Sequence, residues 1–340
     1  MGVQISDIIP RKEIFLEDLK GRTIAIDAFN AIYQFLTTIR QQDGTPLMDS
    51  QGKITSHLSG LFYRNINLLI EGIKPVYVFD GKPPKMKAEE IERRLIQKEI
   101  ASDRYEQAKS EGNVEDMRKY SQQTVKINDS IIKESKELLE AMGIPIVQAG
   151  GEGEAEASFL AKNNKVWATA SQDYDTLLYG TPTLIRNLTL ARKRKTITGY
   201  VDVNIELIDF EYVLNSLQID KDQLICLGIL VGTDYNPGGV KGIGQKRALE
   251  IVRQYKYPIN IFEYIKNSDK YELTFDWQAI FKEFHEYQCC ENPKIEFKQV
   301  NEEKVRELLT KKEFSLERIN SGLEKLKQVK EKNKQKVLPF

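Results

Sequence analysis

Three short apolar segments of the chain lead into aspartates, and this repeated pattern limits the fold more than any other feature. The segments are residues 22–27, 75–80 and 165–170, and each ends at an aspartate or within three residues of one. They are rich in β-branched and aromatic residues, which is typical of buried strands. Helical patterns separate them, and strand–helix–strand alternation is typical of parallel sheets. We therefore expect an α/β fold with a mostly parallel, twisted sheet and helices on both faces.

The acids after these strands belong to a larger set. Seven carboxylates lie on loops and helix starts that follow predicted strands: Asp27, Asp80, Glu152, Glu154, Asp173, Asp175 and Asp234. A doubly wound sheet brings such positions to one edge, where ligands of open α/β folds bind. Without cations these acids would repel one another and raise one another's pKa values. Hard divalent metals take oxygen ligands, and two metals about 4 Å apart suit in-line displacement at phosphorus. The set therefore predicts a two-metal site for phosphoryl chemistry.

Each acid also has a simpler interpretation. Asp27, Asp80 or Asp175 would serve as a helix cap, and Glu152 and Glu154 would favour a helix N-terminus through its dipole. Capping accounts for any single acid. It does not account for the repetition of strand and acid, or for the two pairs of acids at a spacing of two residues.

Other metal ligands are scarce. The chain has only two histidines and three cysteines. Neither His57 nor His285 has the spacing of a metal site, and no cysteine pair has the Cys-x-x-Cys spacing of zinc sites. Cys226 is expected to be a small buried apolar residue. This scarcity supports a carboxylate site and a reducing compartment, which is the cytoplasm with its nucleoid or, in a eukaryote, the nucleus.

The charge balance gives a mixed indication about nucleic acids. The formal net charge is zero, from 50 basic and 50 acidic residues, which counts mildly against a nucleic-acid binder. Basic residues nevertheless cluster at 192–195, 241–247 and 325–336, and local clusters matter more than the total when phosphate is the ligand. Gly242 and Gly244 precede Lys246 and Arg247 at a predicted helix start, a pattern typical of DNA backbone binding. The alternative is a plain glycine turn.

The remaining segments predict mainly helices. Expected helices cover residues 31–36, 56–71, 205–217 and 221–231, two charged helices cover 85–140 with a break near 112–113, and further helices fill the last hundred residues. Further strands are expected at 144–147, 184–188 and 196–203, with the basic residues 192–195 as a turn before the last one. From Lys325 onward the chain is Lys-rich and is expected to be disordered. No apolar stretch is long enough to span a membrane.

Taken together, these motifs make the chain resemble a flap endonuclease of the structure-specific 5′ nuclease superfamily, in the short form typical of archaea. The resemblance covers almost the entire length, and the match around Asp80 is highly specific. It rests on residues 26–28, 32–35, 55–58, 72–84, 152–155, 172–175, 232–235 and 242–248.

The resemblance implies roles for individual residues. Two Mg²⁺ ions, for which Mn²⁺ substitutes, would bind the seven acids. Asp80, Glu152 and Glu154 would hold one ion, with Asp27 near it through water, and Asp173, Asp175 and Asp234 would hold the other. Lys87 and Arg94 would contact the scissile phosphate from the base of a helical arch. Tyr33 would stack on a base, and Gly2 would place the N-terminus near the site.

The resemblance also implies an activity and partners. The chain would cleave branched DNA with a 5′ flap, would act as a 5′–3′ exonuclease in replication and repair, and would be a monomer without membrane contact. Gln335, Leu338 and Phe340 form a partial version of the family's sliding-clamp-binding box. Rival interpretations are a dedicated exonuclease, a repair-type junction nuclease, or a non-catalytic branched-DNA-binding or clamp-tethered adaptor. A binder gains nothing from concentrated negative charge beside phosphates.

The expected organisation is one nuclease domain, residues 1–325, followed by a flexible clamp-binding tail, residues 326–340. Its parts are an N-terminal nuclease region, an arch, an internal nuclease region, and a C-terminal helical region with a helix-hairpin-helix-type DNA-binding element. They cover residues 1–110, about 82–140, 140–260 and 260–325. Two departures from the family pattern stand near the first glutamates. Gly150 and Gly151 replace a Pro-Ser pair, which is expected to loosen that turn, and Glu156 is an additional acid, interpreted as a solvated helix residue.

Overall fold

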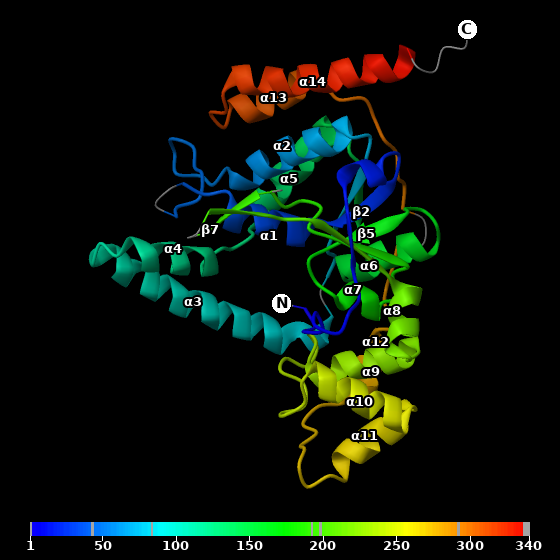
Figure 1. The fold of residues 1–340 in the computed structure, drawn as a ribbon. Helices are drawn as coiled ribbons and strands as arrows, with labels where there is room; N and C mark the ends of the chain where they lie inside the picture. The colour runs from blue at the N-terminus through cyan, green and yellow to red at the C-terminus, as the bar shows by residue number, and fades with distance from the viewer. Residues whose placement is uncertain are drawn as a thin grey trace.

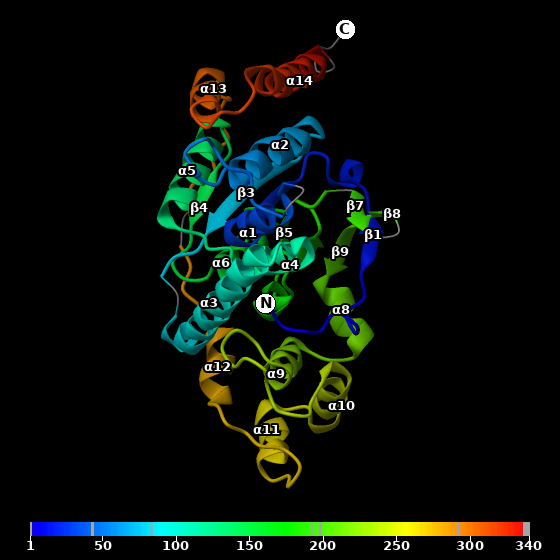
Figure 2. The same ribbon diagram turned by 90° about the vertical axis from the view of Figure 1, so that its left-hand side faces the viewer.

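The computed structural model describes residues 2–41, 44–82, 84–191, 193–196, 199–290 and 293–335. Its centre is a seven-stranded sheet with the order β1-β9-β6-β5-β2-β3-β4 (Figures 1 and 2). The strands are β1 (Lys12–Ile14), β2 (Thr23–Asp27), β3 (Lys74–Phe79), β4 (Ile146–Gln148), β5 (Ala168–Ala170), β6 (Thr183–Arg186) and β9 (Ile205–Asp209). Pairs among β6, β5, β2, β3 and β4 are parallel, while β9 pairs antiparallel with β6 and β1. The predicted mostly parallel sheet is confirmed.

Both faces of the sheet are buried, and alternate residues of each strand point to opposite faces. In β2, Ile24 and Ile26 pack in one core with α1 (Ala28–Thr38), α2 (Ser56–Ile70) and α5 (Asp129–Ala141). Ala25 packs in a second core with α6 (Gly153–Lys162) on the other face. The sheet therefore has helices on both faces, as the alternation of strands and helices predicts.

A third core holds a layer of helices that begins beside the sheet and extends to the bottom of Figure 1. Its helices are α7 (Asp175–Leu178), α8 (Phe210–Leu217), α9 (Lys221–Val231), α10 (Gln245–Tyr255), α11 (Pro258–Lys266) and α12 (Trp277–Glu283). The N-terminal segment adds Val3, Ile5 and Ile9 to this core, and Cys226 is fully buried in it, as expected. This burial fixes the start of the chain between the sheet and the helical layer.

The arch consists of α3 (Ala88–Ser110) and α4 (Val114–Gln123), which project from the body beyond the short 3₁₀ turn η2 (Lys85–Lys87) (Figure 1). The predicted break near residues 112–113 is confirmed, and Asn113 caps α4. The predicted limit of the arch at residue 140 is wrong. Helix α5 buries Ile131, Leu138 and Leu139 against the body of the protein, because its apolar stripe is wide enough to join the main core.

Two further predictions about local structure are wrong. Residues 205–209 form strand β9 rather than the start of a helix, and α8 begins only after Asp209, whose side chain caps it. The basic residues 193–195 lie in strand β7 (Lys193–Thr196), which pairs with β8 (Gly199–Asp202), and not in a turn. Strand β1 and the 3₁₀ turn η1 (Leu16–Leu19) were not predicted.

Two helices, α13 (Glu302–Thr310) and α14 (Leu316–Gln335), form a C-terminal cap over α2 and α5. The predicted disorder from Lys325 is wrong as far as residue 335. Ile319, Leu323 and Leu326 are buried in the main core and extend the apolar face of α14 past Lys325. Within the described residues, no helix is long and apolar enough to cross a membrane.

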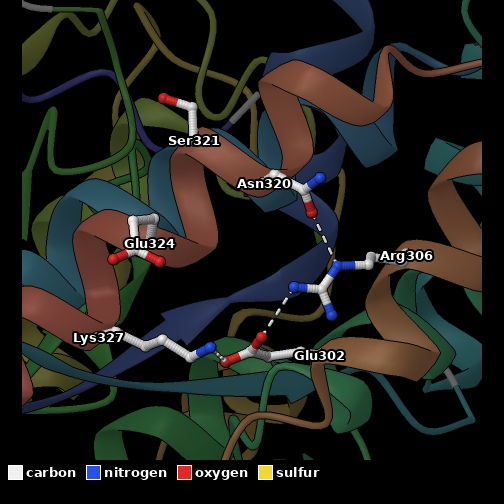
Figure 3. A pocket seen from close by; sticks show the side chains of 6 residues that line it. All are labelled: Glu302, Arg306, Asn320, Ser321, Glu324 and Lys327. Atoms are coloured by element: carbon white, nitrogen blue, oxygen red, sulfur yellow. Dashed lines mark hydrogen bonds and ion pairs between the residues drawn. The ribbon is translucent and has the colours of Figure 1, made fainter.

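Polar contacts join the two helices of the cap to each other. Figure 3 shows a shallow pocket in which Arg306 of α13 donates to Glu302 at 2.8 Å and to Asn320 of α14 at 2.8 Å. Lys327 of α14 lies 3.2 Å from the other oxygen of Glu302. These contacts fix the angle between α13 and α14.

Glu134 attaches the C-terminal cap to the body. Lys312 of the cap lies 2.7 Å from one of its oxygens, and His57 of α2 lies 3.1 Å from the other. Burial raises the pKa of Glu134, but His57 and Lys312 outweigh it and lower the pKa to about 2.

A carboxylate whose pKa is lower in the folded than in the unfolded state stabilises the fold while it is charged. This stabilisation is lost as the pH falls through the folded-state pKa. We expect Glu134→Gln to lower stability at pH 7 by on the order of 1 kcal/mol. The difference in stability between the wild type and Glu134→Gln should shrink as the pH falls from about 4.5 towards about 2. Thermal unfolding of both proteins at pH 7 and pH 3 measures it, and an equal gap at both would contradict the ion-pair role.

Candidate active site

The predicted acids meet at one edge of the sheet. Asp27 ends β2, Asp80 follows β3, and Asp173 follows β5. Since β5, β2 and β3 are adjacent and parallel, their carboxyl ends lie side by side. The chain runs from β2 to β3 on one side and reaches β5 on the other, so the strand order reverses at β2. Ligands of open α/β sheets bind at such a reversal.

The other acids reach this edge from helices. Glu152 precedes α6 and Glu154 lies in its first turn, after β4. Asp175 begins the short helix α7. Asp234 follows helix α9 rather than a strand, which corrects one part of the sequence pattern. We call these seven acids the acid cluster.

Backbone donors hold several of these carboxylates in place. Asp80 accepts the N–H of Gly153 at 2.8 Å, and Asp175 accepts the N–H of Val3 at 2.6 Å. Gly2 donates its N–H to Asp173 at 3.1 Å, and a Cβ at Gly2 would lie only 2.8 Å from the Cβ of Asp173. Glycine is therefore the residue that allows the N-terminus to come this close, as expected of Gly2.

The capping interpretation holds in part. Asp27 accepts the N–H of Asn30 and caps α1. Asp175 does not cap α7, which begins after Tyr174 without a side-chain cap. Capping and membership of the acid cluster are thus compatible at Asp27.

The acids perturb one another strongly. Burial raises the pKa of Asp27 to about 8, and the neighbouring Asp80 adds to the effect. Burial and Glu152 raise the pKa of Asp80 to about 6, while burial and Asp234 raise the pKa of Asp175 to about 7. The pKa of Glu154 is raised well above its ordinary value by burial and then by Asp175. Such mutual repulsion is expected of carboxylates that need a cation.

Two basic residues at the base of the arch face the cluster. Lys87 pairs with Glu152, lies 3.4 Å from Asp234, and sits over the ring of Tyr235. Arg94 donates to Asp234 at 2.7 Å and is oriented by Glu90, which is 3% exposed. Burial raises the pKa of Asp234, but Lys87 and Arg94 outweigh it, so this pKa is lower than usual. The base of the arch thus supplies positive charge at the edge of the sheet.

The chemistry of the donor set fits hard divalent cations. All seven acids offer oxygen atoms, which Mg²⁺ and Mn²⁺ prefer. Among the described residues, no three His, Cys, Asp or Glu side chains already form a set of ligands for one ion. Lys87 holds Glu152 and Asp234, and backbone N–H groups hold Asp80, Asp173 and Asp175. The assignment of each acid to an ion therefore stays a prediction.

Sequence reasoning missed several residues that position the acids. Asn30 donates its amide to Asp173 at 3.0 Å, and its place three residues after Asp27 in one helical turn was an available signal. Ser171 donates to Glu154 at 3.0 Å. Arg186 of β6 donates to the hydroxyl of Tyr174 at 2.6 Å and so anchors the turn between Asp173 and Asp175. No local pattern indicated Arg186.

The other predicted DNA contacts lie outside the acid cluster. Tyr33 on α1 is 41% exposed, as a stacking residue requires. Exposed residues that precede or begin α10 include Gly242, Gly244, Lys246 and Arg247. Gln335 ends α14, but its side chain is not described, and Leu338 and Phe340 lie outside the described residues.

The interpretation of Glu156 as a solvated residue is wrong. Its side chain on α6 is fully buried. The reason is tertiary, because the backbone of Cys290, in the segment after α12, lies against it. His57 is likewise buried, and its Nδ1 has no hydrogen-bond partner in the described structure.

Known proteins share both the sequence and the fold. Residues 1–101 match the XPG N-terminal domain, and residues 143–234 match the XPG I-region. Flap endonuclease 1 from Pyrococcus furiosus is 53% identical over 99% of this chain and 98% of its own length. The solved structure of flap endonuclease-1 from Methanococcus jannaschii is 40% identical, with a TM-score of 0.76 over 96% of this chain and 98% of that one. The catalytic core of Rad2 in complex with DNA substrate shares the fold at 24% identity, with a TM-score of 0.73 over 96% of this chain and 100% of that chain.

Proposed function

Because this chain belongs to the flap endonuclease family, we propose that it cleaves the 5′ flap of branched DNA and also degrades DNA as a 5′–3′ exonuclease. The observation that carries this proposal is the acid cluster at the strand-order reversal, faced by Lys87 and Arg94. Carboxylates can bind metal ions, and basic side chains can stabilise the charge on a phosphate. The two together suit hydrolysis of a phosphodiester bond.

We propose that the acid cluster binds two Mg²⁺ ions, for which Mn²⁺ can substitute. Asp80, Glu152 and Glu154 would hold one, with Asp27 near it through water. Asp173, Asp175 and Asp234 would hold the other. When bound, such ions lower the pKa of water and stabilise negative charge at phosphorus. The raised pKa values of Asp27, Asp80 and Asp175 support this, since a nearby cation would relieve their repulsion.

The chain's own cations would act on the substrate. Lys87 and Arg94 are held by acids of the cluster, so a phosphate entering the site would compete with carboxylates for them. Such a competition would orient both side chains towards the scissile group. Tyr33, and the backbone and basic side chains at the start of α10, would contact the DNA away from the cut.

Cleavage of a labelled 5′-flap duplex with and without Mg²⁺ tests the proposal. A flap endonuclease releases the flap as one fragment, whereas an enzyme restricted to exonuclease activity releases short products from a blunt duplex and leaves flaps uncut. A non-catalytic adaptor would bind the flap DNA without cleaving it under any metal condition. We further propose that the protein acts as a monomer in the compartment that holds the DNA.

The tail carries a separate proposal, that residues 335–340 bind a sliding clamp through Gln335, Leu338 and Phe340. The single aromatic anchor, Phe340, is one fewer than the family box usually has, and interface energy tends to concentrate in such anchors. We therefore expect weak stimulation of cleavage by the organism's own clamp, and none after deletion of residues 335–340.

The comparison is flap cleavage by the full-length and shortened chains, each with and without clamp. Intrinsic cleavage should be the same for both chains. If the clamp stimulates both chains equally, residues 335–340 do not bind it.

A further inference from the structure

The buried acid Glu156 has contacts that the proposed chemistry does not explain. Its Oε2 accepts the backbone N–H of Cys290 at 2.8 Å, and the backbone N–H of Gly150 and the thiol of Cys289 also face the carboxyl group. Its other oxygen, Oε1, is buried without a hydrogen-bond partner of ordinary geometry. A buried carboxyl group is costly unless it is bonded, so its retention points to a role in holding its neighbours.

The segment held by Glu156 is residues 287–290, which we call the coil. It lies at the start of the long connection that runs along the side of the molecule from α12 to α13 (Figures 1 and 2). The coil has a second attachment to the same helix, because Lys162 at the end of α6 donates to the hydroxyl of Tyr287 at 3.2 Å. The ring of Tyr287 also packs edge-on against Tyr179, 5.1 Å away between centroids. Two points on α6 therefore hold the coil against the body.

The coil covers the turn at Gly150 and Gly151, which leads to Glu152 and which we call the glycine turn. A Cβ built on Gly150 would lie 3.5 Å from the carbonyl oxygen of Gln288, which places the two backbones in contact. On its other side the turn is bonded to the loop after β3, since Gly81 donates its N–H to the carbonyl of Gly151 at 2.7 Å. The turn is thus enclosed between the coil and the residue after Asp80.

This enclosure fixes two members of the acid cluster relative to each other. Gly153, directly after Glu152, donates its N–H to Asp80 at 2.8 Å. A glycine-rich turn has no side chains of its own to limit its backbone, so its conformation depends on the segments that pack against it. Movement of the coil would therefore change the position of Glu152 relative to Asp80 and Lys87.

We propose that Glu156 is a positioning residue, which clamps the coil onto the glycine turn and so holds Glu152 in place for metal binding. This inference rests on the proposed metal-dependent nuclease function. It also links the helical layer that ends in α12 to the acid cluster, through a contact more than a hundred residues apart in the sequence.

Three variants of Glu156 weaken its contact with the coil to different degrees. Glu156→Ala removes every acceptor from the N–H of Cys290. Glu156→Asp withdraws the carboxylate by one methylene and perturbs the fold less. Glu156→Gln keeps the length and one carbonyl oxygen for Cys290. Glu134→Ala is the matched control, because it also removes a carboxylate that joins two distant segments, but at the contact between α5 and the C-terminal cap.

The readout is the single-turnover rate of 5′-flap cleavage as a function of Mg²⁺ concentration. Residues that orient metal ligands typically change metal affinity or activity by about 10- to 100-fold. We expect Glu156→Ala to need about tenfold more Mg²⁺ for its half-maximal rate, with Glu156→Asp between it and the wild type. Glu156→Gln should restore most of the wild-type behaviour. Affinity for flap DNA, measured by fluorescence anisotropy in EDTA, should not change in any of them.

An unchanged Mg²⁺ dependence in both Glu156→Ala and Glu156→Asp would overturn the proposal. An equal shift in Glu134→Ala would also overturn it, because general destabilisation would then be the cause. Failure of the wild-type chain to cleave flap DNA is a different result, which refutes the proposed function itself.

Discussion

We expect Asp173→Ala to abolish cleavage of a 5′-flap duplex and to leave the affinity for the uncleaved DNA within a few-fold of the wild type. Asp173 accepts hydrogen bonds from Gly2 and Asn30 and lies among the other acids of the cluster, where a carboxylate would repel a phosphate unless a cation stood between them. Its removal therefore affects the metals and the reaction before it affects DNA binding. The same outcome is expected for Asp80→Ala, from the opposite side of β2.

The measurement is single-turnover cleavage at saturating Mg²⁺, with DNA binding followed separately in EDTA. Asp269→Ala is a suitable control, because Asp269 is an exposed acid in the loop after α11. Its rate should equal that of the wild type. Turnover at the wild-type rate by Asp173→Ala would refute the two-metal assignment.

Lys87→Ala and Arg94→Ala are expected to lower the single-turnover rate about 100-fold, with a much smaller loss of DNA affinity. A cation aimed at the transferring phosphate acts mainly on the transition state, where negative charge is greatest, and loss of one such contact costs on the order of 3 kcal/mol. Both residues lie at the base of the arch and already point at the acid cluster through Asp234. They are thus in place before DNA arrives.

A comparison along the arch separates chemistry from general electrostatics. Lys109 lies near the far end of α3, is exposed, and has only a weak ion pair with Glu106 at 4.0 Å. Lys109→Ala removes the same charge and should leave the rate of the chemical step unchanged. Single-turnover rates that do not change in Lys87→Ala and Arg94→Ala would contradict their role in catalysis.

The local sequence pattern was sufficient to predict the central strands of the sheet. Strands β2 and β3 were predicted within one residue of their observed ends, since an apolar run bounded by a turn and an acid has few other solutions. Helices α2 and α9 were predicted equally well. The gathering of the acids also followed, because the carboxyl ends of adjacent parallel strands must lie at one edge.

Local pattern failed where a segment's state depends on a distant partner. Residues 205–209 alternate weakly enough to pass for a helix start, and they form a strand because β6 and β1 offer edges to pair with. Helix α5 carries charged residues like those of the arch, and its apolar stripe becomes part of the core because α2, α13 and β4 pack against it. Helix α14 continues past Lys325 because Leu326 is buried in the main core.

The sequence by itself thus determined which strand-end acids gather at one edge of the sheet, because strand and turn patterns are local and parallel strands bring their ends together. Only the tertiary structure decided how those residues are held. Glu156 is buried because the coil crosses α6, and Lys87 meets Glu152 because the arch begins beside the glycine turn. Burial and ion pairing depend on segments more than sixty residues apart, and no local spacing of residues records which distant segments will meet.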